Sequence, residues 1–108
     1  MTTPYPITTL PGGLRVITSA MPHMHSVSVG IWIGIGGRYE TPRNAGIAHF
    51  IEHLLFKGTR QRDAKAISQA VEGVGGYLNA FTGEESTCYY AKASDRHIDT
   101  LLDVLSDM

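Results

Sequence analysis

The sequence predicts an α+β fold, in which helices pack on one face of a largely antiparallel sheet. Short runs with the two-residue period of strands come in pairs around tight turn signals. Longer runs with the helical period of 3.6 residues are grouped and do not alternate regularly with the strands. The expected order is β-β-β-α-α-β-β-α, and hairpins combined with clustered helices are typical of α+β domains.

The first elements are a predicted hairpin and a longer strand. Residues 7–10 and 14–19 are short extended runs on either side of Pro11-Gly12-Gly13, a strong turn signal. Residues 26–34 then alternate between apolar and small side chains, which is the pattern of a strand with one buried face. The residues expected on that face are Val27, Val29, Ile31 and Ile33.

Two helices and a second hairpin are predicted in the later part of the chain. Asp63 is expected to cap a helix from residue 64 to about residue 74, and Asp95 to cap one that starts near residue 96. Residues 77–82 and 86–93 are predicted strands joined by a tight turn. No cap signal ends the last helix, so we expect the chain to stop within that helix and to be part of a longer domain.

The most apolar predicted helix, residues 46–56, contains three ionisable residues: His49, Glu52 and His53. On a helix the two histidines lie about 40° apart, and Glu52 completes an arc of about 100°. Apolar residues fill the opposite side, so we expect this helix to be buried nearly all round and polar only on that arc.

A divalent metal would account for three ionisable groups on one arc of a buried helix. Unpaired buried polar groups cost several kcal/mol each, whereas histidines at i and i+4 can both reach one zinc ion. Glu52 would then reach a zinc-bound water and activate it as a general base. The spacing is the H-x-x-E-H arrangement of the inverzincins. The alternative is that the histidines are structural and satisfied in the core.

Composition and charge exclude several classes of protein. The chain has 9 Lys and Arg against 10 Asp and Glu, a net charge of −1, and no basic face for nucleic acid or an anionic membrane. No apolar run is long enough to span a membrane. The first six residues lack the features of a signal or transit peptide, and one cysteine, Cys88, permits no internal disulfide. We therefore expect a cytoplasmic protein, with Cys88 packed as a small hydrophobic residue.

Two blocks of this sequence resemble the zinc-site region of the pitrilysin-type metallopeptidases. The first is Gly37-Arg38-Tyr39-Glu40 followed by residues 46–59, and the second is Asn79-Ala80-Phe81-Thr82 followed by Glu85, Thr87, Tyr89 and Tyr90. The family includes insulin-degrading enzyme and the mitochondrial processing peptidase. The resemblance implies a zinc-dependent endopeptidase that hydrolyses peptides or unfolded polypeptide segments, with His49 and His53 as Zn2+ ligands and Glu52 as the catalytic base.

The resemblance also implies how a peptide substrate is bound and which zinc ligand is missing. An extended peptide would pair with the strand Asn79, Ala80, Phe81 and Thr82; the alternative is that Asn79 and Thr82 merely end a strand. In the family the third ligand is a glutamate roughly 70–80 residues beyond the motif. Only 55 residues follow His53, so we expect that glutamate past Met108 and the 108-residue piece alone to be inactive.

The sequence leaves a second class of function and several details open. Some relatives of these peptidases are non-catalytic subunits that bind peptides or assemble into complexes, but they usually lack part of the motif, which is complete here. The partner can be a second copy, a different subunit or a second half-domain.

Arg38 and Glu40 are expected to form a structural salt bridge, and no role for Glu85 follows from the sequence.

Overall fold

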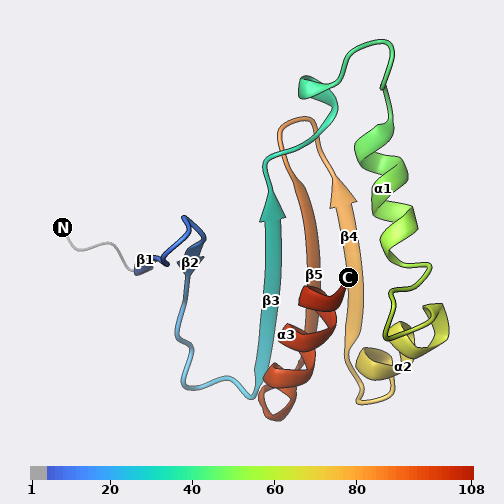
Figure 1. The fold of residues 1–108 in the computed structure, drawn as a ribbon. Coiled ribbons are helices and arrows are strands. Elements are labelled where there is room, and N and C mark those ends of the chain that lie inside the picture. Colours follow the sequence, from blue (N-terminus) through green and yellow to red (C-terminus); the bar gives the residue numbers. More distant parts are fainter. Residues whose placement is uncertain (1–4) are drawn as a thin grey trace.

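The computed structural model has a three-stranded antiparallel sheet with helices on one face (Figure 1). The strand order is β3 (Ser26–Ile33), β5 (Thr87–Ser94) and β4 (Tyr77–Thr82), so β4 is an edge strand of this sheet. The structure describes residues 5–108; residues 1–4, part of the segment examined above for targeting signals, lie outside it. The predicted α+β fold and its element order are confirmed.

Three α-helices and two short 3-10 turns complete the fold. The helices are α1 (Ile47–Leu55), α2 (Ala64–Glu72) and α3 (Ile98–Asp107). The turns η1 (Gly37–Tyr39) and η2 (Asp95–His97) precede α1 and α3. None of the helices in residues 5–108 is long and apolar enough to cross a membrane.

The predicted opening hairpin forms a small sheet of its own. Strands β1 (Ile7–Thr9) and β2 (Arg15–Ile17) pair antiparallel, and all six of their residues are exposed. In Figure 1 this hairpin stands to one side of the three-stranded sheet, joined to β3 by an extended connection. It therefore adds little to the core.

The core lies between the sheet and helices α2 and α3. Central strand β5 supplies three buried residues, and the two helices supply the others. Val27, Val29 and Ile31 of β3 pack against them as the alternation predicted, whereas Ile33 is 39% exposed. The buried cluster is Ile67, Val71, Tyr89, Ala91, Ala93, Leu101, Val104 and Leu105. Burial of this apolar surface, at roughly 25 cal/mol per Å², is the main favourable contribution to folding.

The predicted cap of α2 is confirmed and that of the last helix is wrong. Asp63 accepts a hydrogen bond from the Ala66 N–H at 2.7 Å, as an N-cap residue does. Asp95 instead begins η2, and α3 starts only at Ile98. The Asp95 N–H donates to the His25 carbonyl at 3.0 Å, so this residue ties the end of β5 to the segment before β3.

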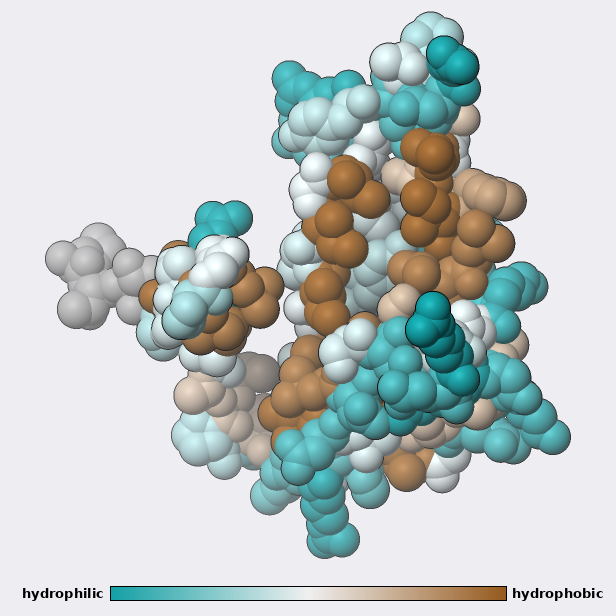
Figure 2. Space-filling view, in the orientation of Figure 1, coloured by the Kyte–Doolittle hydropathy of each residue, from teal (hydrophilic) through white to brown (hydrophobic). Residues whose placement is uncertain are grey.

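The expectation that α1 is buried nearly all round is wrong. Ala48 is its only fully buried residue, and Phe50 remains 62% exposed. The reason is that α1 lies beside edge strand β4, so only one side of the helix meets the sheet, and no other part of residues 5–108 covers it. Figure 2 shows the resulting hydrophobic surface over α1 and β3, with a hollow between them. Its lining residues are Ile31, Ile33, Leu55, Tyr89, Leu105 and Met108.

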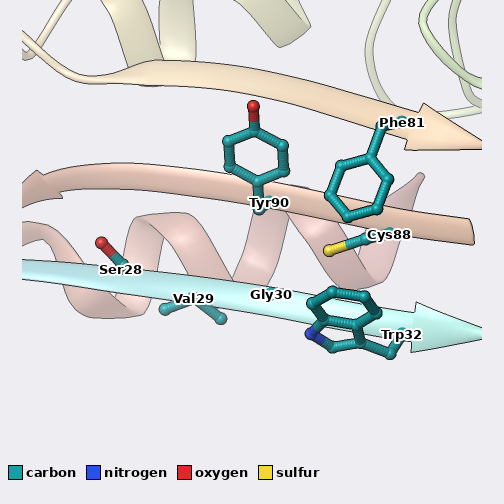
Figure 3. A pocket seen from close by; sticks show the side chains of 7 residues that line it. All are labelled: Ser28, Val29, Gly30, Trp32, Phe81, Cys88 and Tyr90. Carbon is teal, nitrogen blue, oxygen red and sulfur yellow. The ribbon is translucent and has the colours of Figure 1, made fainter.

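The face of the sheet away from the helices carries aromatic side chains. Trp32 and Phe81 meet edge to face with ring centroids 5.4 Å apart, and Tyr90 lies beside them around an open hollow of about 270 Å³ (Figure 3). Cys88 at the base of the hollow is 2% exposed, as predicted for a small hydrophobic residue, and burial raises the pKa of its thiol. No carboxylate, histidine or basic side chain lines this hollow.

A polar cluster joins the loop after α1 to the end of α3. Asp107 accepts hydrogen bonds from the Thr59 hydroxyl and the Arg62 guanidinium, both at 2.8 Å. Asp103 forms a second ion pair with Arg62. The Asp103 side chain stays exposed, whereas the loop covers that of Asp107. The Thr59 hydrogen bond, followed by that of Arg62, lowers the pKa of Asp107.

Asp107→Asn is expected to destabilise the fold at neutral pH and to have little effect in acid. Because the folded-state pKa of Asp107 lies below its unfolded value, its carboxylate stabilises the fold above about pH 4. That contribution is lost as the pH falls through the lowered pKa. Thermal unfolding from pH 7 to pH 2 should therefore show the midpoints of parent and variant converging. A gap that stays constant with pH would contradict the assignment, and Asp99→Asn in the same helix is the matched control.

Candidate active site

The three ionisable residues of α1 converge on one point. The Nε2 atoms of His49 and His53 are 2.8 Å apart, and their ring centroids are 4.6 Å apart. One ligand atom from each histidine and from Glu52 can be chosen so that all lie within 4.8 Å of one another. Within residues 5–108 this is the one cluster of three or more such side chains close enough to hold a metal ion.

The donor set of this cluster fits a zinc ion. Imidazole nitrogen and carboxylate oxygen are ligand types that zinc binds in proteins, and two imidazoles at i and i+4 approach one ion from the same side of a helix. Both histidines are exposed, so an ion and a substrate can reach them, while Glu52 is half-buried. The cluster thus offers two nitrogen ligands with a carboxylate next to them.

Glu40 holds the N-terminus of α1, and the predicted salt bridge between Arg38 and Glu40 is wrong. The two carboxylate oxygens of Glu40 accept hydrogen bonds from the N–H groups of Gly46 and Ala48, each at 2.8 Å. These donors have no partner within a helix, and a negative charge there complements the helix dipole. Gly46 precedes the helix with φ of +86°, a conformation that glycine adopts without strain.

Arg38 pairs with Glu85, which gives that residue the role that the sequence did not reveal. The same loop docks on the β4–β5 turn through its backbone, where the Arg38 N–H donates to the Glu84 carbonyl at 2.8 Å. A Cβ on Gly36 would lie 2.4 Å from the Gly83 carbonyl oxygen, so the approach requires glycine. The loop therefore connects this turn to the residue that caps α1. The sequence did contain a signal for this pair, because the two blocks that resemble the family carry opposite charges at Arg38 and Glu85.

Strand β4 presents part of its backbone at an open edge of the described sheet. The Gly83 N–H donates to the Ser86 carbonyl, so these two residues form a hydrogen-bonded pair. Along an antiparallel ladder, pairs of opposite residues alternate between hydrogen-bonded and non-hydrogen-bonded. From the register, Asn79 and Phe81 bond to β5, while the backbone groups of Ala80 and Thr82 point outward. The Asn79 side-chain oxygen accepts the outward Ala80 N–H at 2.8 Å.

The side chains of these four residues divide between the two faces of the sheet. Asn79 and Phe81 are exposed on the aromatic face, whereas Ala80 and Thr82 are half-buried on the face that carries the helices. The Thr82 hydroxyl donates a hydrogen bond to Oε2 of Glu52. The structure therefore brings Thr82 to the α1 cluster and leaves the Asn79 and Phe81 side chains on the opposite face.

Tyr89 on the neighbouring strand lies on the helix-bearing face opposite Ala80 in the register. Burial raises the pKa of its phenol, and the negative charge of Glu52 raises it further. Tyr89 thus remains a neutral phenol at physiological pH. Neither Tyr89 nor the Thr82 side chain can be connected with Glu52 from the sequence, because their proximity depends on how α1 packs on the sheet.

Residues 15–108 match the model of the insulinase family, peptidase family M16. The chain belongs to this family. An uncharacterized zinc protease of Mycobacterium leprae is 54% identical over 101 residues, which cover 94% of this chain and 23% of the relative. A zinc protease of Bacillus subtilis, also uncharacterized, is 48% identical over 100 residues, 93% of this chain and 24% of the relative.

The chain is also similar to a mitochondrial protein and to a solved structure. A probable mitochondrial-processing peptidase subunit beta of Arabidopsis thaliana is 46% identical over 94% of this chain and 19% of its own. The crystal structure of a protease from Helicobacter pylori superposes with a TM-score of 0.89 at 31% identity, covering 95% of this chain and 25% of that one. The chain thus spans about a quarter or less of the length of these relatives.

Glu40→Ala is expected to loosen the start of α1. The substitution leaves the Gly46 and Ala48 N–H groups without their carboxylate partner, at a cost of about 1–3 kcal/mol for a pair of charge-assisted bonds. Chemical denaturation should show the lost stability, and hydrogen exchange should accelerate at both amides. Glu84→Ala, an exposed carboxylate nearby, is the control. Unchanged exchange at Ala48 would show that Glu40 does not cap this helix.

Proposed function

We propose that this chain carries the metal-binding part of a zinc-dependent endopeptidase, in which His49 and His53 bind the ion and Glu52 is the general base. The observation that carries the proposal is the convergence of the two Nε2 atoms, 2.8 Å apart, with the Glu52 carboxylate beside them. Membership of a peptidase family and the names of the bacterial relatives as zinc proteases support the choice of metal and reaction.

The chain's own residues divide the chemistry between binding and proton transfer. When bound, zinc polarises a carbonyl oxygen and makes water more acidic. His49 and His53 hold the ion as neutral imidazoles and leave room for further ligands. Glu52, next to this position on the same helical arc, takes the proton of the attacking water and transfers it to the leaving amine nitrogen.

We further propose that residues 1–108 are the N-terminal part of the catalytic domain and that a third zinc ligand lies outside them. Catalytic zinc sites usually have three protein ligands. The acidic residues that follow the motif are placed elsewhere: Glu72 in α2, Glu85 with Arg38, and Asp103 and Asp107 with Arg62. The relatives are about four or more times longer than the matched segment, so they contain further residues that can supply it.

The proposed substrate is an extended peptide that adds a strand to the outer edge of β4. The outward backbone groups of Ala80 and Thr82 offer the hydrogen bonds once a peptide displaces the Asn79 side-chain oxygen from the Ala80 N–H. Such pairing makes few demands on substrate sequence. A peptide there would lie beside Glu52, because Thr82 is part of this edge strand and its hydroxyl donates to the Glu52 carboxylate. The Arabidopsis relative is named as a subunit, so a partner subunit or second half-domain is also proposed for this chain.

Glu52→Gln should abolish peptide hydrolysis and leave zinc bound. The amide keeps the shape of the side chain but cannot take a proton, which typically costs about 10²–10⁴-fold in rate. The test uses a protein of the relatives' full length that carries this chain, with a fluorogenic peptide assay and elemental analysis for zinc. Glu72→Gln is the matched control, since Glu72 is exposed on α2. Cleavage by Glu52→Gln at the parent rate would show that Glu52 is not the base.

The same assays on the 108-residue chain examine the proposed third ligand. We expect this chain to bind zinc more weakly than the longer protein and to show no turnover. Tight, stoichiometric zinc and peptide cleavage by the short chain would mean that one of its own residues completes the site.

Ala80→Pro should weaken peptide binding more than it slows the chemistry. Proline removes an N–H that points to the open edge and leaves the ladder to β5 intact, so KM for an unstructured peptide should rise. Phe81→Pro is the comparison, because it removes an inward N–H and damages the sheet itself. Circular dichroism checks the fold of both variants. An unchanged KM in folded, zinc-loaded Ala80→Pro would place substrate binding elsewhere.

A further inference from the structure

Thr82 is the described residue that joins the edge strand β4 to the ionisable cluster on α1 by a side-chain hydrogen bond. Its hydroxyl donates to Oε2 of Glu52, across 30 positions of sequence. Both residues are half-buried, so the bond is partly shielded from water, and a charge-assisted bond in such a place is stronger than an exposed one. The β-branched Thr82 side chain is itself restricted in χ1 by the strand, which fixes the direction of the hydroxyl.

The contact leaves the two carboxylate oxygens of Glu52 in different situations. Oε2 accepts the Thr82 hydroxyl, while Oε1 has no hydrogen-bond partner among residues 5–108. A carboxylate held through one oxygen loses part of its rotational freedom, and its other oxygen stays available to a second partner. The Glu52 carboxylate lies within 4.8 Å of a ring nitrogen of each neighbouring histidine, and the hydrogen bond limits how far a side chain with three rotatable bonds can move from there.

We propose that Thr82 is a positioning residue for the reaction: its hydroxyl holds Oε2 of Glu52 so that Oε1 is the oxygen that takes the proton. This inference rests on the proposed function. Thr82 then has two separate tasks, since its backbone lies at the edge where the peptide pairs and its side chain orients the base. Substrate binding and base orientation are thereby built into the same residue.

The two tasks can be separated by changing the side chain alone. Thr82→Val keeps the β-branched shape and the backbone but removes the hydroxyl, and Thr82→Ser keeps the hydroxyl. A positioning role affects the step after binding, so it should appear in kcat rather than KM. A direct substrate contact of the side chain would raise KM instead.

The experiment measures kcat, KM and zinc content in a protein of the relatives' full length that carries this chain. Thr82→Val should lower kcat about 10-fold, the effect expected when a hydrogen bond to a charged group is lost, and change KM by less than about twofold. Thr82→Ser should recover most of the parent kcat. All variants should retain stoichiometric zinc, because Thr82 touches neither histidine in the described contacts.

Thr87→Val is the matched control. Thr87 lies directly opposite Thr82 in the β4–β5 register, but its hydroxyl donates to the Ile35 carbonyl and not to Glu52. It should lower the unfolding midpoint, since a buried hydrogen bond is lost, and leave kcat near that of the parent at a temperature where all variants are folded.

Several results would overturn the inference. These are a parent-like kcat in Thr82→Val, a raised KM with unchanged kcat, loss of zinc from Thr82→Val, or no recovery in Thr82→Ser. An equal fall of kcat in Thr87→Val would also do so, because it would attribute the effect to general loosening of the sheet. A parent protein that neither binds zinc nor cleaves peptides would instead overturn the proposed function.

Discussion

The position of α1 against the edge of the sheet determines the geometry of the candidate site, and polar contacts contribute much of what holds it. The helix fully buries only Ala48, so hydrophobic packing alone fixes it weakly within the described residues. Glu40 binds its first N–H groups, and Thr82 binds Glu52 on its second turn. Past its last residue, the loop that carries Thr59 and Arg62 is bound to α3. Each such bond contributes modestly, and together they hold the helix along its length.

This arrangement has a consequence for chemistry at the cluster. The two histidines stay exposed because α1 lies at the margin of the sheet, where an ion and a peptide can reach them. The carboxylate between them in sequence is half-buried and bonded to the strand whose outer edge is open. A helix buried in the core would satisfy its histidines by packing but would close the site to a substrate. The position of α1 that leaves its apolar residues exposed is thus the same position that keeps the cluster accessible.

Local patterns were sufficient to predict most of the fold. Alternation in residues 26–34 identified β3, Asp63 marked the start of α2, and glycines marked the turns. The spacing of His49, Glu52 and His53 identified the cluster, since i, i+3 and i+4 positions share a helix face.

What local patterns did not predict are contacts between elements distant in sequence. The partner of Glu40 is the backbone of α1 and that of Arg38 is Glu85, which no local charge pattern specifies. The exposure of α1 was not predicted, because an apolar helix sequence does not show whether the residues that would cover it lie within residues 5–108. The Thr82 contact to Glu52 depends on the height at which α1 lies beside β4, a property of the tertiary structure.

Zinc K-edge X-ray absorption, on a protein of the relatives' full length that carries this chain, tests the central claim most directly. We predict one zinc per chain with a first shell of nitrogen and oxygen at about 2.0–2.1 Å and the outer-shell scattering of two imidazoles, which His49→Ala reduces to one. A sulfur shell at about 2.3 Å, or a spectrum unchanged by His49→Ala, would contradict it.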